Sequence, residues 1–213
     1  MNLLLLADGR FPAGGHAHSG GMEAAVMAGR VTGIDTLAAF VDGRLRTAGR
    51  VAAALAAAAA SGVHDLTRVD GEAAARIPSP ALRAASRVQG RQLLRAARAV
   101  FPGVPEGVEE LHHPVAMGAI CAATPGLGPL DAARWAAYDA LSGPASAAVR
   151  LLGLDPFRAW GVVAALVPEA DSIAGDAAAR ATGPLRRLPA CSAPLLDIGA
   201  ELHATSEVRL FAS

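Results

Sequence analysis

The chain contains no lysine, because all 19 of its basic residues are arginine. A phosphate-binding GxxxxGKS/T loop, a Schiff base and a cofactor aldimine each need a lysine, so the enzyme classes that depend on them are excluded. Aromatic residues are scarce as well, with 5 phenylalanines, 2 tryptophans and 1 tyrosine among 213 residues, whereas 52 residues are alanine. Alanine favours closely packed helices over sheets of branched and aromatic residues. The composition therefore predicts an all-α fold.

An excess of either charge is also missing, since 19 acidic residues balance the 19 basic ones. Nucleic acid and anionic membranes attract proteins with a basic excess, so we expect neither as a partner. The longest uncharged helical stretch, residues 51–64, falls short of the roughly 20 apolar residues that cross a bilayer. The N-terminus has no basic signal-peptide segment, and Cys121 and Cys191 form no metal or disulfide motif. We expect a cytoplasmic protein with a single domain, residues 1–213.

Apolar residues recur with helical spacing along most of the chain. We expect one helix to run from residue 35 through the alanine block, and others over residues 23–27, 80–101, 114–123, 129–141, 145–152, 157–167 and 194–204. Gly143 and Pro144 should kink or break the chain after residue 141. Pro168 should separate the helix before it from an acidic segment that leads to Arg180.

Two segments are expected to lie outside these helices. Residues 11–22 carry too many glycines for regular structure. Residues 207–213 follow the last helix, and nothing in the nearby sequence buries Leu210 and Phe211. The sequence thus predicts a bundle of about eight to ten helices with a glycine-rich N-terminal loop and a flexible C-terminal tail.

Histidines occur as two close pairs. His16 and His18 lie in the glycine-rich loop, where two imidazoles could bind nickel or zinc if a third ligand were near. The sequence offers no obvious third ligand, so structural hydrogen bonding is the alternative interpretation. The side chains of His112 and His113 diverge on any regular element, which favours a cap or surface role for that pair.

The predicted helix over residues 80–101 carries a row of arginines on about a third of its circumference. These residues are Arg83, Arg87, Arg91, Arg95 and Arg98. No acidic residue lies between Glu72 and Glu106 to pair with them inside the helix. Either other segments of the chain or solvent neutralise the row, or it docks to an acidic protein surface.

A second candidate interface is formed by Arg134 and Tyr138, four residues apart on one helix face. Arginine and tyrosine are enriched at interface hot spots, although a lone tyrosine at helical spacing often belongs to the core. The buried stripe of this helix is predicted at Leu130, Ala133, Ala137 and Leu141. No catalytic triad, nucleophile elbow, paired-carboxylate motif or dinucleotide fingerprint is present.

Several motifs nevertheless match a known pattern. Leu3-Leu-Leu-Leu-Ala-Asp8 precedes Phe11-Pro-Ala-Gly-Gly-His-Ala-His-Ser-Gly-Gly-Met-Glu23. This arrangement resembles the leucine-rich segment and the glycine-histidine-serine loop of the urease accessory protein UreF family. The resemblance continues through Ser86–Arg91, His113–Gly118, Ser146–Leu151, Ser192–Asp197, His203 and Arg209–Ser213, and so covers essentially the whole chain.

The resemblance implies an all-α scaffold without catalytic activity. Members of the family join the accessory protein UreD, also called UreH, and the nickel-carrying GTPase UreG, and they help to deliver nickel to apo-urease. The family typically dimerises and is proposed to gate GTP hydrolysis. The resemblance therefore implies urease maturation as the function, with no resident cofactor and with nickel handled only transiently in the complex.

The resemblance also implies roles for particular residues. The family's loop motif is matched by Gly14, Gly15, His18, Ser19, Gly21 and Glu23. Arg150 matches a helix motif, and Arg209, Leu210, Phe211 and Ser213 match a tail that packs on UreD. Arg134 and Tyr138 match a helix on the side that faces the GTPase.

Two other functions remain as alternatives. The first is a small helical nickel-binding chaperone that uses His16 and His18 directly. The second is a helical enzyme with a site in the glycine-rich loop, for which the chain lacks a paired nucleophile and base.

Overall fold

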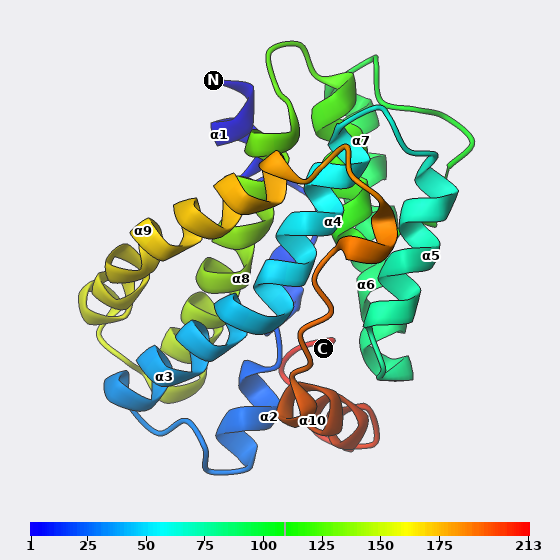
Figure 1. Ribbon diagram of the computed structural model, residues 1–213. Helices are drawn as coiled ribbons and strands as arrows, with labels where there is room; N and C mark the ends of the chain where they lie inside the picture. The colour runs from blue at the N-terminus through cyan, green and yellow to red at the C-terminus, as the bar shows by residue number, and fades with distance from the viewer. Residues whose placement is uncertain (109) are drawn as a thin grey trace.

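The computed structural model describes residues 1–108 and 110–213, and every regular element in these residues is a helix (Figure 1). The α-helices are α1 (Asn2–Leu6), α2 (Met22–Met27), α3 (Ile34–Arg44), α4 (Arg50–Ala60), α5 (Leu66–Arg76), α6 (Pro80–Val100), α7 (His113–Ala123), α8 (Pro129–Leu152), α9 (Pro156–Ala179) and α10 (Pro194–Ala204). A π-helical segment, η2 (Leu45–Gly49), joins α3 to α4 without a break. The predicted all-α, single-domain fold is confirmed.

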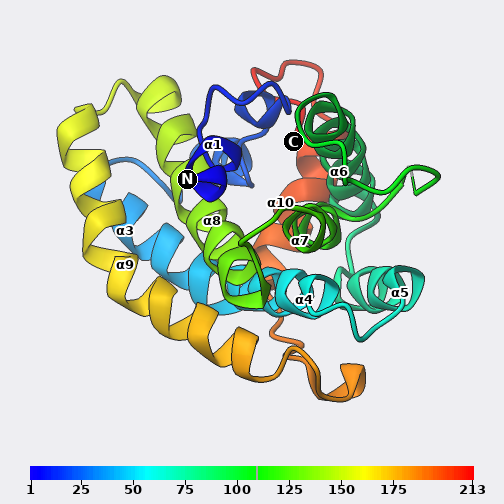
Figure 2. The same cartoon turned by 90° about the horizontal axis from the view of Figure 1, so that it is seen from above.

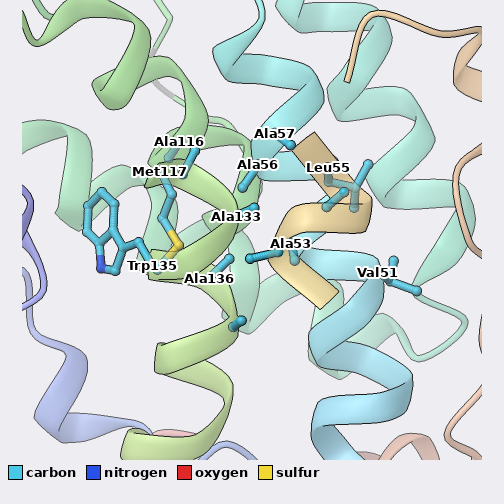
Figure 3. Packing of buried hydrophobic residues seen from close by; sticks show 14 of the residues in the cluster. Val51, Ala53, Leu55, Ala56, Ala57, Ala116, Met117, Ala133, Trp135 and Ala136 are labelled. Carbon is cyan, nitrogen blue, oxygen red and sulfur yellow. The ribbon is translucent and has the colours of Figure 1, made fainter. Parts of the chain in front are cut away.

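Alanine allows the central helices to lie unusually close together. The rod formed by α3, η2 and α4 crosses the molecule diagonally, with α8 and α9 on one side and α7 on the other (Figure 1). Nearly every side chain of α4 is buried. Figure 3 shows the large side chains of Met117 and Trp135 beside each other among Ala56, Ala116, Ala133 and Ala136, and all six residues are buried. The alanine block is therefore the centre of the core.

Helices α5 and α6 pack against α7 (Figure 2), and α10 packs against α6 and α2. Helix α6 begins as the sequence predicts, with Ser79 as cap and Pro80 in the first turn. The cap is reinforced from a distant helix, because Glu201 of α10 accepts hydrogen bonds from Ser79 Oγ and from the backbone N–H of Ala81. This contact fixes α10 against the start of α6.

The predicted boundaries at two prolines are wrong. Helix α8 continues through Pro144, and α9 continues through Pro168. Proline removes one hydrogen bond and favours a kink, but α8 packs along α4 and α9 over its length, and this packing outweighs the local preference. Helix α5 was not predicted, although Asp65 caps it by accepting from the backbone N–H groups of Thr67 and Arg68.

No helix in the described residues is both long enough and apolar enough to span a lipid bilayer.

Candidate functional site

The glycine-rich loop and the C-terminal tail lie together on one side of the molecule (Figure 2). The backbone N–H of Ser19 donates to the carbonyl of Ser213 over 2.6 Å, and the N–H of Ala212 donates to the carbonyl of Ala17 over 2.7 Å. Gly21, which begins α2, has a φ of 87°, a conformation that favours glycine. The loop thus folds into a platform for the last residues of the chain.

Glu23 connects this platform to the tail. Its buried carboxylate accepts hydrogen bonds from His203 Nε2 at 2.7 Å and from the backbone N–H groups of Leu210 at 2.7 Å and Phe211 at 3.1 Å. Burial raises the pKa of the Glu23 carboxyl, but the hydrogen bonds outweigh burial and hold that pKa below its usual value. Glu23 is therefore an ionised acceptor that holds α2, α10 and the tail together.

The structure corrects the prediction that nothing local buries the tail. Phe211 is only 4% exposed, and the guanidinium of Arg150 lies 4.5 Å from the centre of its ring. Arg150 also donates to the carbonyl of His16 over 2.9 Å, so α8, the loop and the tail meet there. Leu210, in contrast, points outward and is 71% exposed. Phe211 thus anchors the tail to the rest of the molecule, whereas Leu210 contributes an exposed apolar side chain to the surface.

The free surface continues along α10. Leu195, Ile198 and Leu202 lie on one face of this helix at spacings of three and four residues, and all three are exposed. Val208 and Leu210 of the tail are exposed next to them in sequence. A group of large apolar side chains that nothing covers is typical of a protein interaction site.

His16 and His18 differ in their surroundings. His18 is buried, and its Nδ1 lies 2.6 Å from Ser213 Oγ, within hydrogen-bond distance. Burial lowers the pKa of His18, with a further contribution from His113. His16 is exposed. Among the residues that the structure describes, no three histidine, cysteine or acidic side chains gather closely enough to hold a metal ion.

His112 is the N-cap residue of α7, and His113 is the first residue of that helix. Of the two roles predicted for the pair, the cap position is therefore confirmed for His112, although its side chain makes no capping hydrogen bond, and the surface role is wrong for it because it is completely buried. Its backbone N–H donates to Asp70 Oδ1 over 2.7 Å. Its two ring nitrogens have no hydrogen-bond partner among the described residues. His113 faces α8, with its Nδ1 3.9 Å from Asp139 Oδ2.

Other segments of the chain contact four of the five arginines in the row on α6. Two of them are paired with acidic residues, Arg87 with Asp70 at 2.9 Å and Arg91 with Glu110 at 3.1 Å. Arg83 donates to the backbone carbonyls of Ile77 and Pro78, and Arg98 donates to those of Pro105 and Val108, which satisfies their hydrogen bonds without neutralising their charge. Intramolecular ion pairing therefore accounts for two of the five arginines, and Arg95 is exposed.

Arg134 and Tyr138 lie on the surface of α8, with exposed fractions of 48% for the Arg134 side chain and 38% for Tyr138. Arg134 Nε donates to Asp171 Oδ1 of α9 at 2.9 Å. The predicted buried stripe is confirmed at Ala133, Ala137 and Leu141, whereas Leu130 is 37% exposed and was placed there wrongly. Arg134 and Tyr138 are thus available to a partner.

A cavity of about 1150 Å³ separates the loop and tail from α6 and α8. Its lining includes both histidines of the loop, Tyr138 and Asp139 of α8, and Arg44 at the end of α3. Sequence reasoning did not find Arg44 or Asp139, because neither belongs to a recognisable motif. Nor could it find the contact of Glu23 with the tail, which joins residues 187 positions apart.

Comparison with known proteins finds relatives that span nearly the whole chain. The sequence model of the UreF family matches residues 31–167. A urease accessory protein UreF from Mycobacterium sp. (strain JLS) is 46% identical over 213 aligned residues, which cover 99% of this chain and 97% of that protein. Proteins of the same name from Mycobacterium marinum and Mycolicibacterium vanbaalenii are 44% and 43% identical, with the same shares covered.

Proposed function

Since the chain belongs to the UreF family of urease accessory proteins, we propose that it is a non-catalytic scaffold in urease maturation. It joins the accessory protein UreD (UreH) to the nickel-carrying GTPase UreG, acts as a homodimer, and promotes nickel insertion into apo-urease while gating GTP hydrolysis. The nucleotide and its phosphate-binding lysine belong to the GTPase, and this chain has no lysine at all. Nickel passes through the complex as cargo.

The observation that carries this proposal is the fixed tail beside an uncovered apolar face. Glu23 holds the backbone of residues 210 and 211, while Leu210 projects outward and α10 exposes Leu195, Ile198 and Leu202. Buried hydrogen bonds hold the backbone of this surface in place, while its exposed side chains are apolar. Such a combination is typical of a binding site for a stable protein partner. We assign this surface, including Arg209, Leu210, Phe211 and Ser213, to UreD.

The GTPase side is assigned to Arg134 and Tyr138 on α8. Both side chains are exposed, and their residue types are those most enriched at interface hot spots. Among the described residues, Arg134 pairs with Asp171 alone, and Asp171 is itself half exposed. Such a surface pair contributes about 0–1 kcal/mol to stability, so a partner can take over the guanidinium at little cost.

Deletion of residues 209–213 tests the proposal. Co-purification with UreD should be lost, because the deletion removes both the outward Leu210 and the anchor Phe211, whereas the helix content measured by circular dichroism should be unchanged. The conservative control is Ala212→Ser, which alters an exposed side chain of the same tail and should leave binding intact. Undiminished binding of the deletion variant would assign the UreD surface elsewhere.

A further inference from the structure

Arg44 lies where the regular helix is interrupted. It is the last residue of α3, directly before the π-helical segment η2. Such π segments occur frequently at functional sites. Within the segment Gly49 approaches α8 so closely that a Cβ atom there would lie 3.0 Å from Ala140 Cβ. The distorted rod is thus pressed against α8, and Arg44 lines the cavity behind the glycine-rich loop.

The guanidinium of Arg44 makes no direct ion pair within the described part of the chain. Its Nε is inaccessible to solvent and has no hydrogen-bond partner among the described residues, and no described carboxylate lies within 4.0 Å of the group. Arg46, two positions later, pairs with both Asp42 and Glu169. Burial lowers the pKa of Arg44, and the charge of Asp139 opposes this effect. Among the residues that the structure describes, Arg44 is therefore a cation without a directly contacting acid, in a partly enclosed space.

The cavity borders this cation. Gly20 of the loop packs so close to it that a Cβ atom there would lie 3.3 Å from Arg44 Nη2 and 3.0 Å from Pro144 Cγ, so a side chain at this position would crowd the guanidinium. His18 and His113 also line the cavity, and burial lowers the pKa of each ring. Asp139, whose charge acts on Arg44, lies beside His113.

We propose that Arg44 binds a small planar oxyanion of the carboxylate or bicarbonate class in this cavity. An unpaired charge away from bulk water is unfavourable, and an oxyanion would compensate it. The planar guanidinium presents two parallel N–H donors, which match the two oxygens of a carboxylate or bicarbonate. The neutral rings of His18 and His113 can add N–H donors without adding charge. This site is independent of the proposed scaffold function.

Thermal unfolding of the full-length chain in sodium formate tests the site. Sodium chloride at equal ionic strength is the reference, because chloride cannot make the paired contact. At about ten times the dissociation constant, formate should raise the Tm of the wild-type chain by roughly 3–5 °C relative to chloride. Arg44→Gln should lose this rise.

Arg50→Gln is the matched control. Arg50 lies on the same rod and also has an inaccessible Nε without a partner, but it does not line the cavity. The Arg50→Gln variant should keep the full formate response. An equal response in Arg44→Gln and the wild type, or no response in the wild type, would overturn the proposal.

A second variant keeps Arg44 in place, in case Arg44→Gln does not fold. Asp139→Asn removes the carboxylate whose charge acts on Arg44, so half-saturation by formate should occur at a severalfold lower concentration. If Asp139→Asn instead lowers the Tm and formate does not restore it, Asp139 is the counter-ion of Arg44 and the proposal is wrong.

Discussion

Glu23 illustrates how a single buried carboxylate can organise a surface. It is the only acidic residue of the loop motif, and it accepts from one imidazole and two backbone N–H groups. Each of these donors belongs to a segment more than 170 residues away in sequence. Hydrogen bonds to a charged acceptor are stronger than those between neutral groups. The position of the tail therefore depends on the charge of this residue as well as on its shape.

We predict that Glu23→Gln loosens the tail. The variant keeps the shape but loses the charge, and hydrogen bonds to charged groups contribute about 1.5–3 kcal/mol. Urea unfolding should show a loss of about that size, and the amides of Leu210 and Phe211 should exchange with solvent much faster. Glu207→Gln, on the exposed part of the same tail, should change neither measurement. Slow exchange at both amides in Glu23→Gln would show that the charge is dispensable.

We also predict that Arg134→Ala weakens recruitment of the GTPase without unfolding the scaffold. An arginine in a desolvated contact typically costs about 2 kcal/mol or more on truncation, which is roughly 30-fold in affinity. Its exposed pair with Asp171 contributes little to stability. Isothermal titration of the UreD-bound scaffold with the GTPase should show this loss at an unchanged Tm.

The double variant with Tyr138→Ala should be weaker still. The control is Arg95→Ala, which removes an exposed arginine from a different helix and should bind like the wild type. Wild-type affinity of Arg134→Ala, or a collapsed Tm, would mean that Arg134 serves the fold and not the partner.

At the scale of elements, close helix packing at a few small residues determines the architecture. Gly118 of α7 faces α4, and a Cβ atom there would overlap the backbone oxygen of Ala56 and contact Ala59 Cβ. The two helices therefore pack backbone to backbone. Such contact requires glycine on one helix and alanine on the other, which is the composition that the two segments have.

We predict that Gly118→Ala destabilises the chain although alanine is the better helix former. Overpacking in a dense core costs about 1–3 kcal/mol, whereas alanine gains only up to about 1 kcal/mol in helix propensity over glycine. The matched control is Gly71→Ala in α5, where a Cβ atom would meet nothing within 4 Å. This control should be stabilised by about 0.5–1 kcal/mol. Chemical unfolding that ranks the two variants in the opposite order would contradict the packing argument.

The sequence predicted those elements whose signals are local. Ser79 and Pro80 indicated the start of α6, and the alanine block predicted the helix α4 by its composition. The signals failed where tertiary packing decides: α8 and α9 pass through Pro144 and Pro168 because neighbouring helices support both halves. The cap at Asp65 was present in the sequence and could have revealed α5.

The candidate site was only partly predictable for the same reason. The loop motif drew attention to His18 and Glu23, but their partners, Ser213 and His203, come from the far end of the chain. Arg44 had no sequence signal, because its significance depends on a π-helical distortion and on a cavity between distant elements. Contacts between remote segments cannot be derived from local patterns.

For the whole molecule, His18, His112 and His113 make stability depend on pH; the first two are buried and His113 is half-buried. Burial lowers the pKa of His18, His112 and His113 in the folded chain, and it is the largest effect on each. In the unfolded chain the same rings take up protons near their usual pKa of about 6.5. The unfolded state thus binds more protons below that pH, so the free energy of unfolding rises with pH. Stability should be complete above about pH 7.5 and should fall as the pH drops through 6.5.

We predict a slope of up to about 1.4 kcal/mol per pH unit for each of these histidines, measured by urea unfolding between pH 7.5 and 5.5. His112→Leu is the most informative variant, because the ring is fully buried and its nitrogens have no partner among the described residues. An apolar side chain there leaves no hydrogen bond unmade. The variant should be at least as stable as the wild type at pH 7.5, and it should lose about a third of the slope, because one of three groups no longer titrates.

His16→Gln, on the exposed loop, should keep the wild-type slope. If His112→Leu keeps the full slope, protonation of the buried histidines does not control acid unfolding, and the carboxylate of Glu23, whose pKa is lowered in the folded chain, becomes the group to test at pH values below about 4.5.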